Sequence, residues 1–299
     1  MVHRRSELSV PASNWKMIEK ALASDADIAF LDLEDSVAPS EKPPARRNVV
    51  RAMRELDWRG KPRAFRVNGL GTPHFYRDIV EVFDDVQGNI DFVILPKAES
   101  TTDIAKISTV LRKLETEAGL EQKLGIEVQI ESAKGLLNAA AIAAANPRIN
   151  AITFGPGDYS ASVGMPSVSI GARDEWDEAY GADRWHFAMQ TVLVAGRAAG
   201  VSVIDGPFAD FRDAEGFRTS CRRARSLGFD GKWCIHPGQI AVANEVFSPT
   251  VEEITWATDV VSAYETAKRK GEGAVAVGNT MIDAASVRMA KRIVEDTAG

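Results

Sequence analysis

Cysteine and histidine are scarce in this sequence, with two of the former and four of the latter among 299 residues. Cys221 and Cys234 stand in no CxxC or other ligand spacing, so we expect reduced, buried thiols. The histidines provide no pair or triplet at the spacing of a zinc site. Any metal site in this chain is therefore expected to use mainly oxygen ligands.

Long apolar runs are missing as well. No stretch reaches the roughly 18 apolar residues of a membrane-spanning helix, and the N-terminal MVHRRSELSVPAS has no apolar run long enough for a signal peptide. These absences predict a cytoplasmic protein without a membrane partner. The formal charge is −6 and the basic residues are dispersed along the chain, which argues against nucleic acid as the main partner.

Two common catalytic signatures are also absent. The loop after the first apolar segment reads VPASNW rather than the GxGxxG of a dinucleotide-binding sheet, and no GxSxG elbow marks a serine hydrolase. The composition, with 45% hydrophobic and 26% charged residues, is that of an ordinary globular protein. The chain has enough apolar material for one large core.

Apolar runs that end in turn residues alternate with amphipathic segments through most of the chain. Eight runs read as strands, and the segments between them read as crossover helices of right-handed β-α-β units. Eight strands favour an α/β fold of the closed TIM-type (β/α)8 barrel class over a doubly wound open sheet, which is the competitor. The predicted strands are 7–10, 28–32, 64–67, 92–96, 125–130, 151–154, 202–205 and 232–235.

The last part of the chain has a different pattern. After the eighth strand, a proline is followed by a long helix to Lys270, a Gly-rich hairpin-like link and a final helix. We assign residues 1–246 to the barrel and residues 247–299 to an appended C-terminal helical lid module. Asp283, which precedes the final helix, reads by itself as the N-cap of that helix.

Two carboxylates follow neighbouring predicted strands. Glu131 ends IEVQI and Asp158 follows AITFGPG, while the intervening AKGLLNAAAIAAANP reads as one helix. Because active sites of such barrels lie at the carboxyl ends of the strands, both acids are predicted to share one rim and to bind Mg²⁺, or Mn²⁺, together with substrate oxygens. The alternative is that one acid caps a helix and the other lies in a turn.

The other strand ends are also polar, whereas the strand interiors read as apolar. Arg66 can bind a carboxylate or stabilise an enolate oxygen, or it can form a structural salt bridge to Glu34 or Asp35. Lys97 can form a Schiff base with a carbonyl substrate, but the many acids nearby favour an ion-paired lysine. We take Arg66, Glu34 and Asp35 as candidate catalytic residues.

Several ordered motifs resemble a known family. LDLEDSVAPSEK, FRVNGLGTP, LPKAES, IESAKGL, FGPGDYSASVGM and DGKWCIHPGQIAVANEVFSP are similar to the HpcH/HpaI aldolase and citrate lyase β-subunit superfamily, and within it to the L-malyl-CoA/β-methylmalyl-CoA lyases. The resemblance implies a TIM-type barrel with a C-terminal lid, a Mg²⁺-dependent reversible Claisen reaction on a CoA thioester, and a homotrimer or dimer of trimers.

The resemblance also assigns residues. It makes Glu131 and Asp158 the Mg²⁺ ligands, Arg66 the group that holds the thioester or enolate oxygen, and Asp283 an acid delivered from a neighbouring subunit for proton transfer. It places coenzyme A and substrate contacts at the residues Ser9, Val10, Lys20, Gly157, Asp158, Ile235 and His236. Asn14 departs from the family, because close relatives often carry an arginine suited to phosphate at this position.

The implied reaction is cleavage of malyl-CoA to glyoxylate and acetyl-CoA. Three other activities stay open at this point: cleavage of citramalyl-CoA, hydrolysis of the thioester on the same fold, and the role of a citrate lyase β-like subunit that works only within a complex. A one-methyl difference in an apolar pocket changes binding by only about 1–3 kcal/mol, so the sequence leaves the preferred acyl group open.

Overall fold

The computed structural model describes residues 3–86, 88–121, 123–167, 169–269, 271, 273–278 and 280–298. The chain divides into two compact units, a larger one over Arg4–Asn244 and a smaller one formed mainly by Glu245–Gly299. Each unit is described by itself below.

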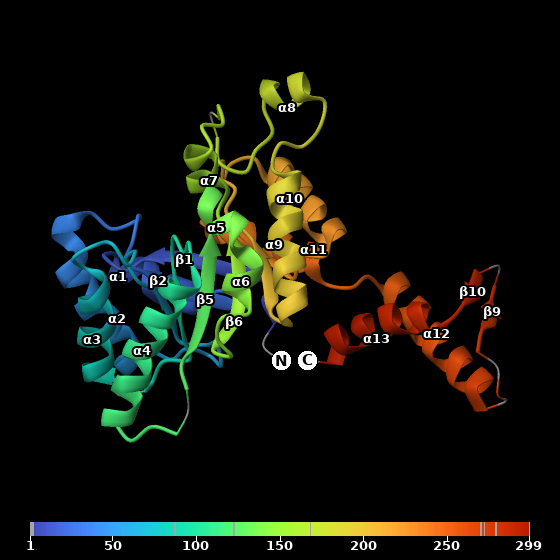
Figure 1. The fold of residues 1–299 in the computed structure, drawn as a ribbon, viewed down its shortest axis with the longest axis horizontal. Coiled ribbons are helices and arrows are strands. Elements are labelled where there is room, and N and C mark those ends of the chain that lie inside the picture. The colour runs from blue at the N-terminus through green and yellow to red at the C-terminus, as the bar shows by residue number, and fades with distance from the viewer. Residues whose placement is uncertain are drawn as a thin grey trace. The chain divides into compact units, whose positions relative to one another are not determined.

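The larger unit is a closed barrel of eight parallel strands in sequence order. This confirms the predicted TIM-type (β/α)8 class and rules out the doubly wound open sheet. Figure 1 shows the strands with helices packed on their outer side. The strands are β1 (Ser6–Pro11), β2 (Ile28–Asp32), β3 (Ala64–Arg66), β4 (Phe92–Leu95), β5 (Gly125–Ile130), β6 (Ile149–Phe154), β7 (Ser202–Asp205) and β8 (Gly231–Cys234).

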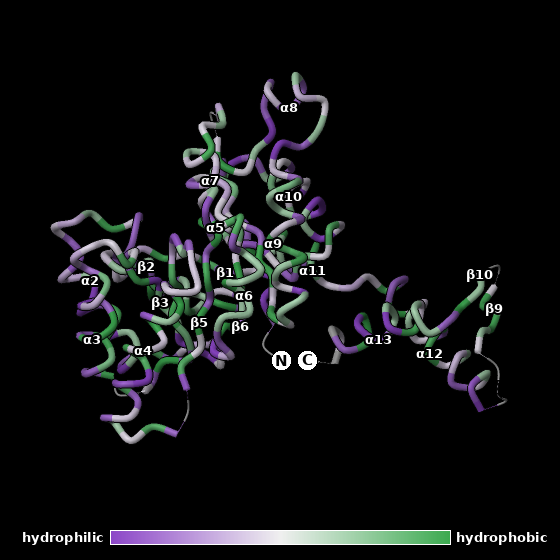
Figure 2. The backbone as a smooth tube through the Cα atoms, in the orientation of Figure 1, coloured by the Kyte–Doolittle hydropathy of each residue, from purple (hydrophilic) through white to green (hydrophobic). Residues whose placement is uncertain are grey.

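Helices follow the strands, as the alternating pattern predicts. Several begin at a side chain that accepts a backbone N–H, including Asn14, Ser100, Ser132 and Asp213, which satisfies donors that the first turn leaves unpaired. Figure 2 shows the mixed hydrophilic and hydrophobic positions along α3 and α4. The longer outer helices are α1 (Trp15–Leu22), α2 (Lys42–Glu55), α3 (Phe75–Val86), α4 (Thr101–Glu117), α9 (His186–Ala199), α10 (Ala214–Leu227) and α11 (Ile240–Phe247).

The connection between β5 and β6 differs from the single helix that the sequence suggested. It consists of two short helices, α5 (Ala133–Leu137) and α6 (Ala139–Ala143), which meet at Asn138 with φ −103° and ψ 5°. The Asn138 side-chain amide donates to the carbonyls of Glu99 and Lys134. A polar side chain that bonds to nearby backbone competes with helix continuation, so the alanine-rich run is interrupted there.

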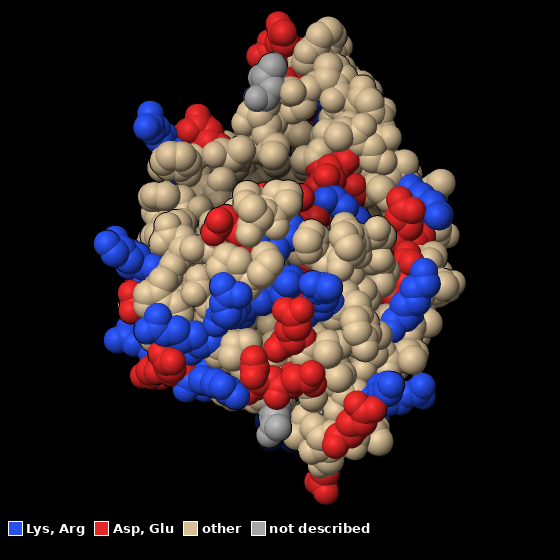
Figure 3. Space-filling model, turned by 90° about the vertical axis from the view of Figure 1, so that its left-hand side faces the viewer, with Lys and Arg blue, Asp and Glu red and all other residues tan. Residues whose placement is uncertain are grey.

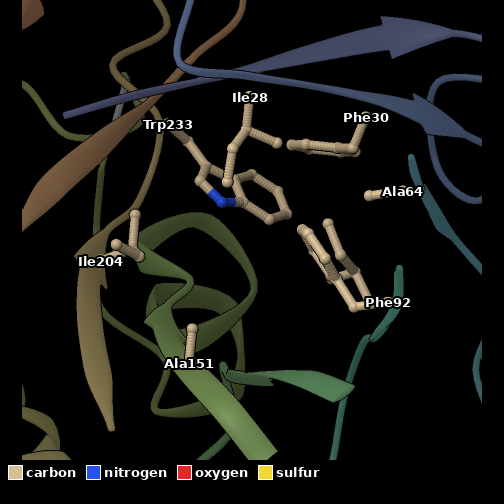
Figure 4. Packing of buried hydrophobic residues seen from close by; sticks show 8 residues of the cluster. Ile28, Phe30, Ala64, Phe92, Ala151, Ile204 and Trp233 are labelled. Carbon is tan, nitrogen blue, oxygen red and sulfur yellow. The ribbon is translucent and has the colours of Figure 1, made fainter. Parts of the chain in front are cut away.

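Apolar side chains from most strands meet inside the barrel. Figure 4 shows the Trp233 indole packed near Ile28 and Phe30, and the rings of Phe30 and Trp233 have centroids 4.6 Å apart. Ala64 and Ala151 supply small side chains that leave room for these rings. Large and small side chains on neighbouring strands thus fill the interior, as barrel packing requires.

The expectation of purely apolar strand interiors is wrong. A buried polar group, here called the floor cluster, lies inside the barrel and consists of Arg4, Glu7, Glu127, Thr153 and Trp233. From Ile126 in β5 to Glu131 directly after it, the chain reads I-E-V-Q-I-E, and residues at alternate positions point to the same side of a strand. Glu127, Gln129 and Glu131 are all buried, so this strand presents a polar line to the barrel interior.

The smaller unit contains α12 (Val251–Arg269), the antiparallel strands β9 (Val275–Val277) and β10 (Thr280–Ile282), and α13 (Ala284–Ala298). Its own core includes Ala257, Val260, Ile282, Val287 and Ala290. No helix in the described part of the chain is both long and apolar enough to cross a membrane. On the face drawn in Figure 3, acidic and basic side chains lie next to one another.

Candidate active site at the barrel rim

Glu131 and Asp158 lie at the carboxyl ends of neighbouring strands. Glu131 follows β5, and Asp158 lies in the first turn of α7 (Pro156–Ser162), which follows β6. Ile130 and Phe154 are partners in the pairing of these two strands. Glu131 is 3% exposed, whereas the Asp158 side chain is 44% exposed. One acid is therefore fixed in the interior and the other faces outward.

The backbone around Glu131 leaves no spare room. A Cβ atom added to Gly155 would lie 2.5 Å from the Glu131 Cβ and 2.5 Å from its Oε2. Real Cβ atoms do not approach other atoms so closely, so glycine is required where β6 passes the Glu131 side chain. The FGPGD motif thus brings the second strand close enough for the two acids to interact.

The negative charge of the buried Glu131 carboxylate is only partly balanced by the hydrogen bonds that it accepts. Its Oε1 accepts from the Lys97 backbone N–H at 2.8 Å, and its Oε2 accepts from the Gln129 amide at 3.2 Å. Burial, followed by the negative charge of Asp158, raises the pKa of Glu131 to about 8, against the opposing charge of Arg66. Such a carboxylate takes up a proton or a cation in preference to standing alone.

Arg66, at the end of β3, forms a two-point ion pair with Asp32. Its Nε and Nη2 donate to the two Asp32 oxygens at 2.6 and 2.7 Å. Its Nη1 lies 3.1 Å from Glu34 Oε2 and donates to Gln129 Oε1 at 3.2 Å. The salt bridge predicted to Glu34 is therefore present, Asp32 is an additional partner, and among the described residues Arg66 forms no ion pair with Asp35.

Lys97 is ion-paired, as the acid-rich rim suggested. Its Nζ donates to Glu34 Oε1 at 2.5 Å and to Asp35 Oδ2 at 3.2 Å, and it lies 3.9 Å from Asp158 Oδ1. Burial of the amine alone would lower its pKa, but the bond to Glu34 and the neighbouring acids raise that pKa above the ordinary lysine value. A firmly protonated amine is not a nucleophile, which disfavours the Schiff-base alternative. We refer to Asp32, Glu34, Arg66, Lys97, Glu131 and Asp158 as the rim cluster.

Lys42 holds the loop that carries Glu34. Its buried Nζ donates to the carbonyls of Leu33 and Glu34 at 2.8 and 2.9 Å and to Asn68 Oδ1 at 2.6 Å. The Asn68 amide in turn donates to Asp78. Burial lowers the pKa of Lys42, although the negative charges of Asp78, Asp32, Glu34 and Asp35 oppose this shift. This support is absent from the sequence prediction, because Lys42 stands in a helical pattern rather than at a strand end.

Sequence reasoning also missed Gln129 and the pairing role of Asp32. Gln129 contacts both Arg66 and Glu131, and Asp32 additionally accepts from Ser36 Oγ at 2.5 Å. The alternation of polar residues in IEVQIE is the signal that could have identified Gln129, since every second side chain of a strand faces one side.

The predicted coenzyme A contacts lie on β1 and on the loop and helix that follow it. Ser9 and Val10 belong to β1, and Val10 is buried, with 2% of the residue exposed. Asn14 caps α1 by accepting from Met17 N at 3.2 Å. Lys20 is exposed in the last turn of α1 and is free to meet a phosphate.

Ile235 and His236 follow β8, which pairs with β1. The backbone N–H groups of both residues donate to Gln239 Oε1 at 2.8 and 3.3 Å. The His236 ring stacks on Phe211, with centroids 4.8 Å apart, and its Nδ1 accepts from Gly238 N at 3.0 Å. The closed barrel therefore brings the first and last predicted contact segments together at one end.

A cavity of about 530 Å³ opens beside the segment that carries Gly157 and Asp158. Its walls include Gly157, Ser160, Met165, Ile170 and Ala209. Ile170 lies over Gly157, since a Cβ added to Gly157 would lie 3.0 Å from Ile170 Cδ1. The space beside Gly157 is thus bounded mainly by small and apolar side chains, together with Asp210.

Asp283 belongs to the smaller unit and caps α13. Its Oδ1 accepts from the backbone N–H groups of Ala285 and Ser286 at 2.9 and 3.0 Å. These bonds lower the pKa of Asp283 below its usual range. The N-cap interpretation is therefore correct, and the catalytic role of Asp283 stays a prediction.

A closed parallel barrel with acids, an arginine and a lysine gathered at the carboxyl ends of its strands defines an enzyme of the barrel class, whose chemistry lies at that rim. The sequence profile described as HpcH/HpaI aldolase/citrate lyase matches residues 5–237. The chain belongs to this family, which confirms the resemblance recognised from its motifs.

Named relatives cover nearly the whole chain. It is 40% identical over 296 residues to the L-malyl-CoA/beta-methylmalyl-CoA lyase of Rhodobacter capsulatus, covering 97% of this chain and 93% of the relative. It is 36% identical over 283 residues to a (3S)-malyl-CoA thioesterase of Cereibacter sphaeroides, covering 93% of this chain and 89% of that one.

Solved structures agree with this relationship. The protein CitE from Mycobacterium tuberculosis, in complex with magnesium, acetoacetate and coenzyme A, superposes with a TM-score of 0.78 at 30% identity, covering 99% of each chain. A citrate lyase from Burkholderia xenovorans LB400 superposes with a TM-score of 0.86 at 20% identity, covering 100% of this chain and 92% of that one. The second similarity is one of fold alone.

Proposed function

We propose that this protein is a Mg²⁺-dependent carbon–carbon lyase that acts on a 3-hydroxyacyl-CoA. It cleaves L-malyl-CoA, β-methylmalyl-CoA or both, releases glyoxylate with acetyl-CoA or propionyl-CoA, and runs the reverse condensation. Family membership and the activity for which the 40% identical relative is named support this assignment. The observation that carries it is the unbalanced charge of the rim.

Five carboxylates gather around the rim: Asp32, Glu34, Asp35, Glu131 and Asp158. The cations among them are Arg66, Lys97 and Lys42, so two negative charges stay unbalanced when every acid is ionised. A divalent cation supplies that charge, and carboxylate oxygens are ligands that Mg²⁺ prefers. The donor set of Glu131 and Asp158 therefore fits the ion.

The same set leaves room for a substrate. In the part of the chain that the structure describes, no group of three or more His, Cys, Asp or Glu side chains is arranged as a complete metal site. Mg²⁺ often takes only one or two protein carboxylates and fills its other positions with water and substrate oxygens. When bound here, the ion would polarise the carboxylate and hydroxyl oxygens of a malyl group.

Arg66 stabilises the charge that forms when the carbon–carbon bond breaks. The electron pair of that bond moves into the thioester, whose oxygen becomes an enolate oxygen, while the hydroxyl-bearing carbon becomes the aldehyde of glyoxylate. Arg66 has five N–H donors, and one on Nη2 lacks a partner among the described residues. A fixed donor of this kind lowers the barrier without reorganisation.

Proton transfers are assigned to acids at the edge of the site. Asp35, whose side chain is 60% exposed beside Lys97, accepts the hydroxyl proton, and Glu34 holds Arg66 and Lys97 in place. The enolate carbon then takes a proton from a water molecule held by Asp283, and the hydroxide left behind takes up the proton that Asp35 accepted.

The assembly we propose is a homotrimer or a dimer of trimers, in which Asp283 serves the site of a neighbouring subunit. Coenzyme A lies along the segments that carry Ser9, Val10, Asn14, Lys20, Ile235 and His236, and the substrate carboxylate meets Gly157 and Asp158. Contact of Asn14 with the nucleotide is weaker than an arginine would give, since its side chain already caps α1.

Hydrolysis of malyl-CoA is the second candidate, because a thioesterase of the family is 36% identical to this chain. The two activities differ in their products: the lyase yields a carbonyl compound and an acyl-CoA, and the thioesterase yields free thiol. Incubation with Mg²⁺ and a panel of malyl-, methylmalyl- and citramalyl-CoA should give glyoxylate or pyruvate without free thiol. Stoichiometric thiol with no carbonyl product would replace the lyase with the thioesterase.

A further inference from the structure

Lys97 has an unusual backbone conformation at the centre of the rim cluster. Its φ is +53°, and Arg59 is the other non-glycine residue with positive φ in the described part of the chain. Arg59 lies in an exposed turn, where its backbone N–H donates to Asp57 Oδ1 at 2.8 Å. A side chain in the left-handed region costs about 1 kcal/mol or more, so the surrounding structure must hold Lys97 in this state.

In this conformation, both the backbone N–H and the side-chain ammonium of Lys97 lie near acids of the rim cluster. The backbone N–H of Lys97 donates to Glu131 Oε1 at 2.8 Å. The side-chain ammonium donates to Glu34 Oε1 at 2.5 Å and reaches to 3.9 Å from Asp158 Oδ1. Lys97 therefore touches Glu131 through its backbone and approaches Asp158 through its side chain.

The backbone N–H and the side chain of Lys97 differ in how far they can move. The backbone N–H is held by the strand end, whereas the Lys97 side chain is 40% exposed and Asp158 is 44% exposed. The ammonium can therefore withdraw from Asp158 toward Asp35, whose side chain is 60% exposed, without leaving Glu34. A divalent ion between Glu131 and Asp158 would repel a neighbouring ammonium strongly, because unit charges a few ångströms apart interact by several kcal/mol in a partly buried site.

We propose that Lys97 is the resident counter-cation of the metal-free rim, a positioning residue whose ammonium occupies the negative field of Asp158 and Glu34 until a divalent ion displaces it. The proposal rests on the metal site assigned under the proposed function. It predicts an effect opposite to that of an ordinary supporting residue: removal of the ammonium should strengthen metal binding, because the ion no longer competes with a resident charge.

The test is a titration of the metal-stripped full-length protein with Mn²⁺, with free Mn²⁺ measured by electron paramagnetic resonance. Lys97→Met keeps the backbone N–H and most of the side-chain volume, and should bind Mn²⁺ on the order of tenfold more tightly than the unmodified chain. Lys97→Arg keeps the charge and should bind as the unmodified chain does. Lys134→Met is the matched control, since Lys134 pairs with Glu99 at 3.2 Å and not with the rim.

Glu131→Gln separates the two hypotheses. If it abolishes Mn²⁺ binding while Lys97→Met binds equally or more weakly than the unmodified chain, the metal site stands and the counter-cation is wrong. If the unmodified chain binds no Mn²⁺, or Glu131→Gln binds as well as it, the metal site is wrong and the counter-cation with it.

The Mg²⁺-induced rise in the thermal unfolding midpoint is a second test, because loss of a merely structural lysine would not increase that rise. Without metal, Lys97→Met should unfold at a lower temperature, because Asp158 loses the charge of Lys97 and Glu34 keeps only Arg66 as its counter-charge. Saturating Mg²⁺ should raise its midpoint by more than it raises that of the unmodified chain, since tighter binding to the folded state stabilises it further. An equal Mg²⁺-induced rise in both proteins would overturn the proposal.

Discussion

The barrel contains two buried polar clusters that use similar residues for different ends. In the floor cluster, all four oxygens of Glu7 and Glu127 accept hydrogen bonds, from Arg4, Trp233 and Thr153. In the rim cluster, the Asp158 side chain is half exposed, and the Lys97 ammonium lies 3.9 Å from its Oδ1. In the floor cluster, the hydrogen-bond donors and acceptors satisfy one another. In the rim cluster, the carboxylate of Asp158 stays accessible to a ligand.

This difference teaches that burial of charge does not by itself mark a site. Buried acids with every oxygen satisfied form a closed network, which fixes the interior of the barrel. The rim cluster is instead an open network, because Asp158 is half exposed and Arg66 has a donor without a partner among the described residues. The carboxyl ends of barrel strands are where open networks are expected, because the loops there form the active site.

The largest expected contrast comes from two glutamates, one on β5 and one directly after it. Glu131→Gln should lower Mg²⁺-dependent turnover of malyl-CoA by about a thousandfold or more, since loss of a metal ligand removes several kcal/mol of stabilisation. Glu127→Gln, four residues earlier on β5 and equally buried, should leave the turnover of the folded protein within a fewfold of normal. Steady-state kinetics with and without Mg²⁺ measure both. Equal losses in the two variants would remove the functional distinction between rim and floor.

Sequence patterns predicted the barrel because the strand signal is local. Apolar runs ended at turn residues, and the observed strands differ from the predicted ones by no more than two residues at an end, as for β6, which begins at Ile149 instead of Ala151. The eight strands could then close in only a few ways, since right-handed crossovers restrict the topology.

Side-chain networks were harder to predict, because they depend on register between strands distant in sequence. Glu7 and Glu127 meet around Arg4 although Arg4 and Glu127 are 123 positions apart, and no short pattern encodes that meeting. Lys42 escaped notice for the same reason. Its helical position gave no sign that its ammonium would reach back to the carbonyls of Leu33 and Glu34.

The second prediction concerns the one cation of the floor. Arg4→Met should lower the free energy of unfolding by about 3–5 kcal/mol, because Glu7 and Glu127 would then lie buried beside each other without a counter-charge. Urea unfolding at neutral pH measures the loss, and activity per folded molecule should be retained. Arg51→Met is the control: its ion pair with Glu55 is exposed, and such pairs contribute about 1 kcal/mol at most. Similar losses in both variants would show that the floor network is dispensable.

The third prediction removes one donor and leaves the charges in place. Thr153 Oγ1 donates to Glu127 Oε1 at 2.6 Å, and Thr153→Val keeps the shape of the side chain without the hydroxyl. We expect a loss of about 1.5–3 kcal/mol in the free energy of unfolding, which is the usual contribution of a hydrogen bond to a charged group. Unchanged stability would mean that the Trp233 indole, 3.3 Å from the same oxygen, suffices.

The smallest change in the free energy of unfolding at neutral pH is expected from Glu7→Gln, which should instead alter how stability depends on pH. Burial, and after it the carboxylate of Glu127, raise the pKa of Glu7 well above its ordinary range, although Arg4 opposes this. The folded protein thus keeps a proton on Glu7 that the unfolded chain loses near pH 4.3. The resulting stability is complete below that pH and declines as pH rises through the raised pKa. Glutamine cannot ionise, so the variant should gain stability relative to the unmodified chain as pH rises. Urea unfolding of both proteins from about pH 4 to pH 9 tests this, and parallel curves would show that Arg4 keeps Glu7 ionised throughout.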